Sequence, residues 1–312
     1  MKILITGGAG FIGSTLTKQL ELEHHELTII DNFNDLLYSS RIKRARCQMF
    51  TGSNIEIIED DINNSELIDF FCRFDVIFNE AGLPGQALSW NSLEKYIQAN
   101  TLGVSAILES IKNTNTKLIQ ASTSSVYGRN AFGGENQAIH PCSPYGVTKS
   151  AAENLISAYS QSFHVNYKIL RYFSVYGPSQ RPDMAIQKFL LDIINNRIIS
   201  ITGDGTQRRD LTYVSDIVDG TISAAFTDSQ HKIFNLSGGK LYSINQIVKA
   251  CSEVTGKEIR IQYINRPVGD QEITSGDYEL ALNELHYKPK VSLHEGIERQ
   301  YNWILENQEF LV

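Results

Sequence analysis

Short apolar runs alternate with longer amphipathic stretches through the first half of the chain. The runs occupy residues 2–6, 26–30, 55–58, 75–79, 117–121 and 167–172. Between them, helix-like patterns extend over about 11–22, 64–72, 92–112 and 144–162. Near-continuous apolar strands separated by helices are typical of a parallel sheet that is covered on both faces. The pattern therefore predicts an α/β fold built on a doubly wound parallel sheet.

The regular alternation of apolar runs and helix-like stretches becomes less clear after residue 175. A helix-like stretch at 185–196 is followed by a short strand, a Gly-rich turn and another helix start within residues 199–220. A further helix is expected near 243–255, and an apolar run follows at 259–264. We expect residues 1–175 to form the main domain, with later returns to it from about 210–240. Residues 176–312 are expected to form mainly a smaller α/β lobe.

Composition and charge narrow the possible functions. The chain has 312 residues with a net charge of −7, and its pI is near 5.6. Nucleic-acid binding needs clustered Lys and Arg, so we expect no nucleic-acid partner. No stretch approaches the length of a membrane span, and the seven histidines show no metal-ligand spacing, so we expect neither a membrane partner nor a metal. The four cysteines lie far apart, as is typical of reduced thiols in a cytoplasmic protein.

A glycine-rich turn follows the first predicted strand. In "KILITGGAGFIGSTL", Gly7, Gly10 and Gly13 stand where a helix opens, with the spacing GxxGxxG. Such a turn lets a pyrophosphate approach the backbone at a helix N-terminus, although similar turns also occur without ligands. Asp31 ends the second strand, about 20 residues later, where an acid accepts hydrogen bonds from the adenosine ribose and favours NAD over NADP. Asp61 follows the third strand and can bond the adenine amino group, or serve as a loop cap, just as Asp31 can be a turn residue.

A tyrosine and a lysine stand one helical turn apart in "SPYGVTK". Ser143 and Pro144 have the residue types of an N-cap and a first helical position, which places Tyr145 in the first turn. Lys149 then lies on the same face of the helix. A neighbouring ammonium group and a helix N-terminus both favour the phenolate form, which makes Tyr145 a candidate base. On spacing alone, a chance pair on a surface helix explains the motif as well.

Three hydroxyl residues follow the fifth predicted strand in "TSSVYG". Thr123, Ser124 and Ser125 either bond to their own turn or bind a ligand. Ligands of a doubly wound sheet bind beyond the carboxyl ends of its strands, where the glycine turn and Tyr145 also lie. The three signals thus indicate one crevice and a Rossmann-type nucleotide-binding domain.

The motifs together resemble those of the extended short-chain dehydrogenase/reductases, specifically the NAD-dependent nucleotide-sugar epimerases and dehydratases. The resemblance covers almost the whole chain and is carried by "TGGAGFIG", "STSSVYG", "SPYGVTK", "LRYFSVYGPSQRPDMA", "GDGTQRRDLTYVSDIVDG" and "RPVGD". Within this family, the pattern is most similar to that of the UDP-glucuronate 4-epimerases. The resemblance implies an NAD cofactor, a UDP-sugar substrate and a homodimer formed through the helices near 92–112 and 144–162.

The resemblance also implies residue roles. Tyr145 takes the proton from the sugar 4-hydroxyl while NAD takes the C4 hydride, Lys149 holds the nicotinamide ribose, and Thr123 bonds the same 4-oxygen. The 4-keto sugar then rotates and receives the hydride on its other face. Further residues that the resemblance places on the cofactor are Phe11, Ile12, Asn32, Ile62, Ala81, Gly82, Asn100 and Phe173.

The residues after Thr123 bear on the sugar chemistry. Dehydratases of this family carry Asp-Glu at these positions, and elimination of water needs such an acid and base. Ser124 and Ser125 are neutral, which argues against dehydration and suits a carboxylate-bearing sugar. Together with Thr123, Ser174 and Arg181, they are our candidates for holding a C6 carboxylate. A hydrogen-bonded turn around a neutral sugar remains the alternative.

The nucleotide diphosphate is expected to meet cations from the second lobe. By resemblance these are Arg209 and Arg266, with Asp270 on the ribose or beside Arg266, and Gln187 is expected next to the substrate. Guanidinium groups suit phosphate oxygens. Without the family resemblance, these arginines would be interpreted as ordinary surface charges. Phe189 can stack on the uracil or pack in the core.

Four positions depart from the glucuronate epimerase pattern. The loop reads "PGQALSW" where an arginine-containing "PGVRASW" is common, so Gln86 and Ala87 are unusual. Ser174 replaces a favoured Thr, and Glu80 replaces a small or apolar residue beside the nicotinamide loop. These changes leave open a 4-epimerase of UDP-glucose or UDP-N-acetylglucosamine. A decarboxylase or dehydratase and a non-catalytic NAD-binding module are the remaining alternatives.

Overall fold

A seven-stranded sheet forms the centre of the molecule. The computed structural model describes residues 1–50, 55–266 and 271–311. All pairings in the sheet are parallel, and the strand order is β12-β7-β5-β4-β1-β2-β3. Its strands are β1 (Lys2–Thr6), β2 (Glu26–Asp31), β3 (Ile55–Glu59), β4 (Val76–Asn79), β5 (Lys117–Thr123), β7 (Asn166–Tyr172) and β12 (Ile233–Leu236). The strand order reverses between β1 and β4, which confirms the predicted doubly wound sheet.

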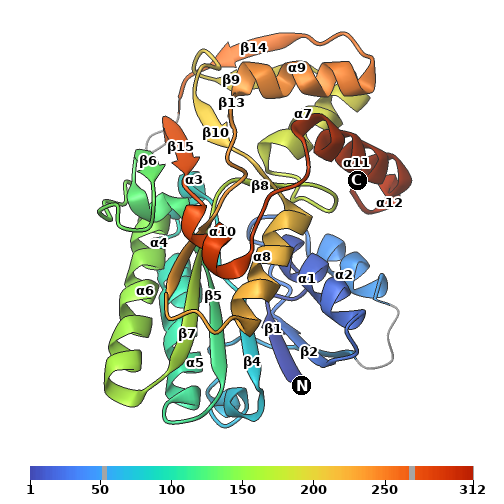
Figure 1. Cartoon of the computed structure of the whole chain (residues 1–312). Helices are drawn as coiled ribbons and strands as arrows, with labels where there is room; N and C mark the ends of the chain where they lie inside the picture. Colours follow the sequence, from blue (N-terminus) through green and yellow to red (C-terminus); the bar gives the residue numbers. More distant parts are fainter. Residues whose placement is uncertain (51–54, 267–270, 312) are drawn as a thin grey trace.

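Helices cover both faces of this sheet, as Figure 1 shows. One face carries α1 (Phe11–Glu21) and α8 (Val214–Phe226), and the other carries α5 (Gly103–Ile111) and α6 (Pro144–Phe163). Successive side chains of a strand point to opposite faces, so Ile3 packs toward α1 and α8 while Leu4 packs toward α5 and α6. Both side chains are fully buried, which explains the near-continuous apolar runs in the sequence.

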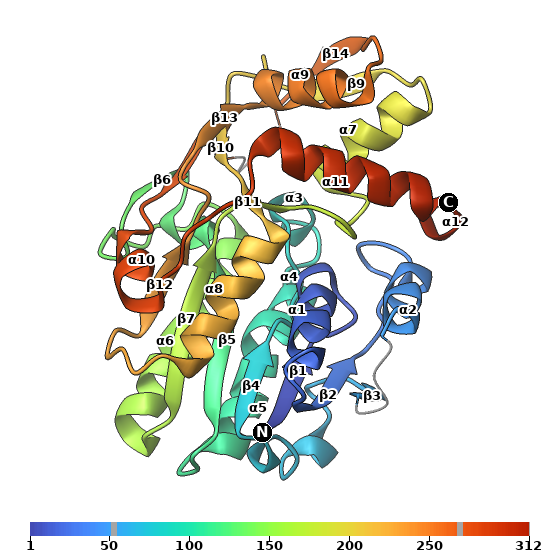
Figure 2. The same ribbon diagram turned by 45° about the vertical axis from the view of Figure 1, so that its right-hand side comes forward.

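A smaller lobe lies above the carboxyl ends of the strands. It contains α7 (Ala185–Ile194), α9 (Ile244–Thr255) and the parallel pair of β9 (Ile199–Thr202) with β14 (Ile261–Ile264). Ser243 and Gln246 form a reciprocal cap at the start of α9, and Gly256 ends it in the left-handed conformation. Figure 2 shows α11 (Leu293–Glu306) lying under α7 and α9, with α12 (Gln308–Leu311) reaching α2 (Ser40–Gln48).

Small sheets connect the lobe to the main body. One is made of β13 (Leu241–Ser243), β10 (Arg208–Asp210), β15 (Ile273–Gly276) and β6 (Asn130–Gly133). Another pairs β8 (Val175–Tyr176) with β11 (Thr212–Tyr213), and α10 (Glu279–Leu285) lies beside β12. The chain therefore crosses between the two regions several times after residue 175, so that the lobe and the main sheet share a cavity.

Two predicted helices differ from the structure. The segment 64–72 forms two 3₁₀ turns, Ser65–Leu67 and Phe71–Arg73, instead of one helix. Its apolar residues have helical spacing, but Phe74 is already extended because the chain enters β4 two residues later. The helix predicted over 92–112 contains α4 (Leu93–Ile97), a π-helical turn (Gln98–Leu102) and α5. Among the described residues, the helices are too short or too polar to cross a bilayer.

Candidate active site

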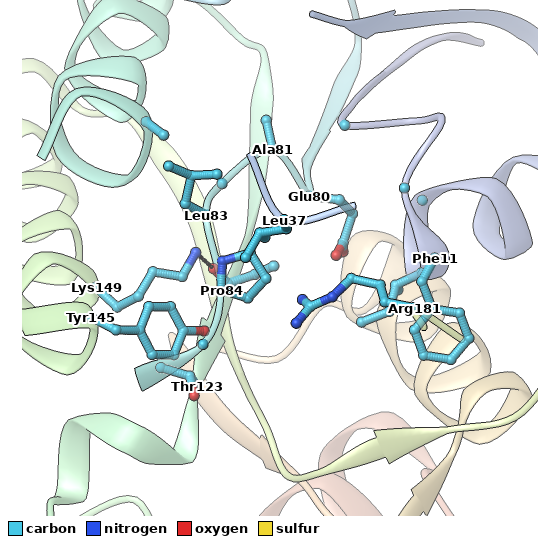
Figure 3. Close-up of a pocket in the computed structure, with 18 of the residues that line it drawn as sticks. Phe11, Leu37, Glu80, Ala81, Leu83, Pro84, Thr123, Tyr145, Lys149 and Arg181 are labelled. Carbon is cyan, nitrogen blue, oxygen red and sulfur yellow. Dashed lines mark hydrogen bonds between the residues drawn. The ribbon is translucent and has the colours of Figure 1, made fainter. Parts of the chain in front are cut away.

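A cavity of about 760 Å³ opens at the carboxyl ends of the central strands. Its wall combines residues that follow β1, β2, β4, β5 and β7 with α6 and with Arg209 of the small lobe. Figure 3 shows Tyr145, Lys149 and Thr123 on one side of this cavity, with Glu80, Arg181 and Phe11 across from them. The candidate residues from distant parts of the sequence are thus brought together in one place.

The glycine turn between β1 and α1 has no room for side chains. A Cβ atom on Gly13 would lie 2.4 Å from the Gly7 carbonyl oxygen, and one on Gly10 would lie 2.9 Å from the same atom. Gly7 has a φ of +67°, which glycine adopts without strain. The bare backbone and the N-terminus of α1 face the cavity, which fits the pyrophosphate of a dinucleotide. The three glycines therefore lie in a tight turn whose geometry suits the predicted cofactor site.

Two carboxylates line the part of the cavity where the sequence predicts the adenosine. Asp31 ends β2, and its Oδ1 accepts hydrogen bonds from the Phe33 N–H at 2.8 Å and from Lys43 Nζ at 3.3 Å. Asp61 accepts a hydrogen bond from Asn32 Nδ2 at 2.8 Å. Both acids line the cavity with oxygens that suit ribose hydroxyl or amino donors. Lys43 joins them there, which the sequence reasoning missed.

The tyrosine and the lysine lie in the first turns of α6. Ser143 caps this helix by accepting a hydrogen bond from the Gly146 N–H, and Pro144 is its first residue, as predicted. Lys149 donates a hydrogen bond of 2.8 Å to the Ala121 carbonyl, which ties α6 to the end of β5. Burial lowers the pKa of Lys149 from 10.5 to about 8, and the charges of nearby acids partly oppose this fall. Lys149 is therefore a strongly desolvated cation.

The phenol of Tyr145 is also buried. Desolvation raises its pKa above the ordinary value, while a hydrogen bond with Thr123 and the charge of Arg181 lower it. Thr123 Oγ1 also accepts a hydrogen bond of 3.1 Å from the Ser125 N–H, which shapes the turn after β5. Thr123 and Tyr145 are thus in direct contact at the cavity wall, where one ligand oxygen can meet both.

Side-chain amides support the serine turn. Gln86 Nε2 donates to Ser125 Oγ at 3.3 Å and to Gln271 Oε1 at 3.0 Å. Gln271 in turn donates to the Gly128 carbonyl at 2.7 Å, which fixes the orientation of both amides. Because Ser125 Oγ accepts from Gln86, its own hydrogen is left to donate into the cavity.

A buried ion pair lies beneath the same turn. Arg171 Nη2 and Glu153 Oε2 are 2.6 Å apart, and their side chains are 2% and 5% exposed. Ser122 donates a hydrogen bond to Glu153, and Arg171 donates one of 2.8 Å to the Tyr127 hydroxyl. The strand end that carries Thr123 is therefore anchored to α6 and β7 by charged hydrogen bonds.

Glu80 brings a second buried acid to the cavity wall. It follows β4, and its Oε1 accepts a hydrogen bond of 2.7 Å from the Tyr172 hydroxyl. Desolvation raises the pKa of Glu80 from 4.5 to about 7, although the Tyr172 hydrogen bond and the charge of Lys149 oppose the rise. The titration of this residue is therefore shifted toward neutral pH, unlike that of an ordinary surface carboxylate.

Most predicted site residues line the cavity. They are Gly7, Gly10, Phe11, Ile12, Gly13, Asp31, Asn32, Asp61, Ile62, Ala81, Gly82, Thr123, Ser124, Ser125, Tyr145, Lys149, Phe173, Ser174, Arg181 and Arg209. The sequence reasoning missed several others that also line it, which are Leu37, Tyr38, Lys43, Pro84, Tyr172 and Gln271. Tyr172 directly precedes the predicted Phe173 at a strand end, and this position is the sequence feature that could have identified it.

Three predicted residues are placed elsewhere, and a fourth falls outside the described part of the chain. Asn100 is buried behind the nicotinamide loop, where it bonds both backbone groups of Leu83, so it holds the loop instead of lining the cavity. Gln187 is fully buried and accepts a hydrogen bond from Gln300, which places it in the core between α7 and α11. Arg266 stands outside the cavity wall and donates to the Gln271 carbonyl. Asp270 lies outside the described residues.

Comparisons with known proteins agree with this geometry. The sequence model of the NAD dependent epimerase/dehydratase family matches residues 3–237. A UDP-glucuronate 4-epimerase of Thermodesulfobacterium geofontis is 35% identical over 99% of this chain and 97% of its own length.

Solved structures are similar over the whole fold. The Bacillus cereus UDP-glucuronic acid 4-epimerase in complex with UDP-glucuronic acid and NAD is 35% identical, with a TM-score of 0.93 over 98% of this chain and 99% of its own. A UDP-N-acetylglucosamine 4-epimerase of Methanobrevibacter ruminantium is 30% identical, with a TM-score of 0.90 over 98% of each chain. The chain therefore belongs to the NAD dependent epimerase/dehydratase family.

Proposed function

We propose that this protein is an NAD-dependent 4-epimerase that interconverts UDP-glucuronate and UDP-galacturonate. The observation that carries the sugar assignment is the pair Ser124 and Ser125, which are neutral, buried and on the cavity wall next to Thr123 and Tyr145. A dehydratase needs an acid and a base at this place, and two serine hydroxyls supply neither. Their hydrogens suit a carboxylate, which accepts hydrogen bonds only.

Tyr145 and Thr123 act together on the sugar 4-oxygen. Thr123 aligns this oxygen, and Tyr145 takes its proton and later returns it. NAD, when bound, accepts the hydride from C4 and gives it back. Lys149 holds its ammonium group next to the base, at a point fixed by the Ala121 carbonyl. The same residues serve both directions, because the 4-keto sugar rotates between the two hydride transfers.

The carboxylate must be kept from leaving as CO₂. A 4-keto uronate is a β-keto acid, which decarboxylates when its C–CO₂ bond aligns with the carbonyl π system. Ser124, Ser125 and Ser174 line the cavity with neutral donors, and Arg181 adds a cation whose charge is shared with Asp183 at 2.8 Å. We propose that these groups hold the carboxylate out of that alignment.

The small lobe is proposed to bind the nucleotide. Arg209 reaches the cavity wall from β10, with its Nη1 donating to the carbonyls of Arg208 and Glu272. This backbone tether orients the guanidinium group for a diphosphate. We propose residues 1–175 as the NAD-binding domain, together with the returns at about 210–240, and residues 176–312 as mainly the sugar-nucleotide lobe.

A neutral UDP-sugar is the second candidate. Gln86 stands where an arginine is common in glucuronate epimerases, and its amide supports a serine without adding a positive charge. The structural similarity to a UDP-N-acetylglucosamine 4-epimerase favours the same alternative. A 4-epimerase of UDP-glucose or UDP-N-acetylglucosamine would use the same Thr123, Tyr145 and Lys149.

The test compares the three substrates. Purified protein is incubated without added NAD with UDP-glucuronate, UDP-glucose or UDP-N-acetylglucosamine, and the products are resolved by NMR. We expect UDP-galacturonate from the first and little or no turnover of the other two. Turnover of the neutral sugars alone would overturn the uronate assignment. The Tyr145→Phe variant is the matched control, because it should turn over none of them.

The oligomeric state and location are further proposals. Exposed apolar side chains gather on α4, the following π turn and the start of α6, where Leu93, Ile97, Leu102 and Val147 are 46%, 40%, 48% and 51% exposed. We propose that this face pairs with a second copy in a homodimer in the cytoplasm, where the four free cysteines stay reduced. Light scattering should give twice the 35.0 kDa chain mass, and Leu102→Glu should lower it.

A further inference from the structure

Glu80 occupies a position that the proposed reaction does not use. It follows β4 directly and lies against the glycine turn, since a Cβ on Gly7 would lie 2.8 Å from the Glu80 carbonyl carbon. Its side chain interacts electrostatically with Lys149 and Tyr145, the two residues at the redox end of the cavity. Figure 3 shows its carboxyl group pointing into the cavity across from them. Glu80 therefore faces the space between the glycine turn and the catalytic pair.

A chain of three oxygen–oxygen contacts leads from Glu80 into the protein. Glu80 and Tyr172 are 2.7 Å apart, Tyr172 and Thr221 are 2.9 Å apart, and Thr221 Oγ1 is 2.8 Å from the Ile217 carbonyl. Each contact needs one hydrogen, but the two hydroxyl groups supply only two. When Glu80 is protonated, it donates to Tyr172 and supplies the third. When Glu80 is ionised, Tyr172 donates to it and one contact is left without a hydrogen.

This series of hydrogen bonds can hold Glu80 in either protonation state. The protonated state satisfies every contact, whereas the ionised state keeps the Tyr172 hydrogen bond, which the charge of the carboxylate makes stronger. The charged and titratable groups that interact with Glu80 are Lys149 and Tyr145 from α6 and Tyr172 from β7. Arg181, from the segment after β8, lies on the same side of the cavity as Glu80. A ligand that brings or removes one positive charge beside Glu80 will therefore shift its protonation.

We propose that Glu80 is a proton acceptor coupled to the charge of the bound nicotinamide. It is ionised opposite the cationic NAD⁺ and protonated opposite the neutral NADH. When the bound cofactor gains a hydride, the Glu80 carboxylate takes one proton from water, and it releases that proton when the hydride leaves. The carboxyl group thereby keeps the local charge nearly constant through the redox cycle, separately from the substrate proton held by Tyr145.

The inference rests on the NAD dependence of the family and not on which sugar is turned over. The burial that raises the pKa of Glu80 to about 7 places its titration in the range where a neighbouring charge changes its state. By linkage, a carboxylate that favours NAD⁺ over NADH must favour it more as the pH rises through its titration. The ratio of the two affinities is therefore the direct readout.

The experiment measures this ratio without turnover. The full-length protein is equilibrated with mixtures of NAD⁺ and NADH at pH values from 5.5 to 9, separated rapidly from free nucleotide, and the bound fraction of each is quantified. In the wild type, we expect the bound NADH-to-NAD⁺ ratio to fall with rising pH, by up to about tenfold per pH unit within the titration. The Glu80→Gln variant keeps a hydrogen-bonding amide toward Tyr172 and should lose most of this dependence.

Two further variants separate Glu80 from other titrating groups. Glu94→Gln removes an exposed acid at the rim of the same cavity and should leave the pH dependence of the wild type unchanged. Tyr172→Phe removes a hydrogen bond that favours the carboxylate, so its pH dependence should move to higher pH. Equal slopes in the wild type and Glu80→Gln would overturn the proposal, as would a wild-type ratio that stays within twofold between pH 6 and pH 8.5. Either result would leave the epimerase assignment untouched.

Discussion

Replacing Lys149, which we propose to be catalytic, should stabilise the cofactor-free protein while it abolishes turnover. Lys149 is 7% exposed, and burial lowers its pKa from 10.5 to about 8. At about 1.4 kcal/mol per unit of pKa change, this fall means that burial of the charged lysine destabilises the folded protein by about 3 kcal/mol. Lys149→Met keeps most of the apolar stem and removes the charge, so it should recover part of this free energy.

The direction of the pH dependence follows from the pKa values of Lys149 in the folded and the unfolded chain. The penalty is full below pH 8, where the folded and unfolded chains are both protonated, and it disappears as the pH rises toward 10.5. The stability gained by Lys149→Met should therefore be about 2 kcal/mol smaller at pH 9.5 than at pH 6. Lys149 can donate to the Ala121 carbonyl as an ammonium or as an amine, so the variant loses this hydrogen bond at both pH values.

Urea unfolding followed by circular dichroism measures the difference. Wild type and variant are compared at both pH values, and midpoints are interpreted where the slope of the transition stays constant. Lys95→Met is the matched control, because Lys95 is an exposed lysine at the cavity rim and should show little change. A difference for Lys149→Met that is independent of pH, or that grows with pH, would refute the reasoning.

Three single variants and one double variant test the base, the cofactor turn and the support of the serine turn. Tyr145→Phe should lower turnover roughly 10²–10⁴-fold and leave NAD binding within about twofold, measured by kinetics and by the cofactor content of the purified protein. Gly13→Ala places a Cβ 2.4 Å from the Gly7 carbonyl oxygen, so NAD affinity measured by calorimetry should fall at least about tenfold. Arg171→Met should cost about 3–5 kcal/mol in urea unfolding, because it leaves Glu153 buried and unpaired, whereas adding Glu153→Met should restore part of that loss. Unchanged NAD affinity in Gly13→Ala, or a double variant less stable than Arg171→Met, would contradict these expectations.

The sequence predicts the residues whose roles are local. The glycine turn, the Ser143 cap and the spacing of Tyr145 and Lys149 depend on a few neighbouring residues, and the structure confirms their placement. The apolar runs also locate every strand of the main sheet up to β7. Most of these strands are buried on both faces and carry a strong signal, whereas the edge strand β3 is only partly buried.

Residues whose surroundings come from distant segments were harder to place. Gln187 has the residue type of a ligand contact, but α11 covers it with Gln300, which is 113 residues away. Asn100 similarly meets Leu83 across the fold and supports the loop. No local pattern predicts the hydrogen bond between Tyr172 and Glu80, because this contact depends on the order of β4 and β7 in the sheet. Such contacts can be predicted only when the topology of the fold is known, because they join segments that are far apart in the sequence.

The central claim is that C4 loses and regains the same hydride inside one active site. The direct test supplies UDP-glucuronate deuterated at C4 to the purified protein in ordinary water and examines the product by NMR and mass spectrometry. We expect UDP-galacturonate that keeps its deuterium at C4 and its C6 carboxylate. Deuterium replaced by solvent hydrogen, or release of CO₂ in place of the epimer, would contradict the proposed function.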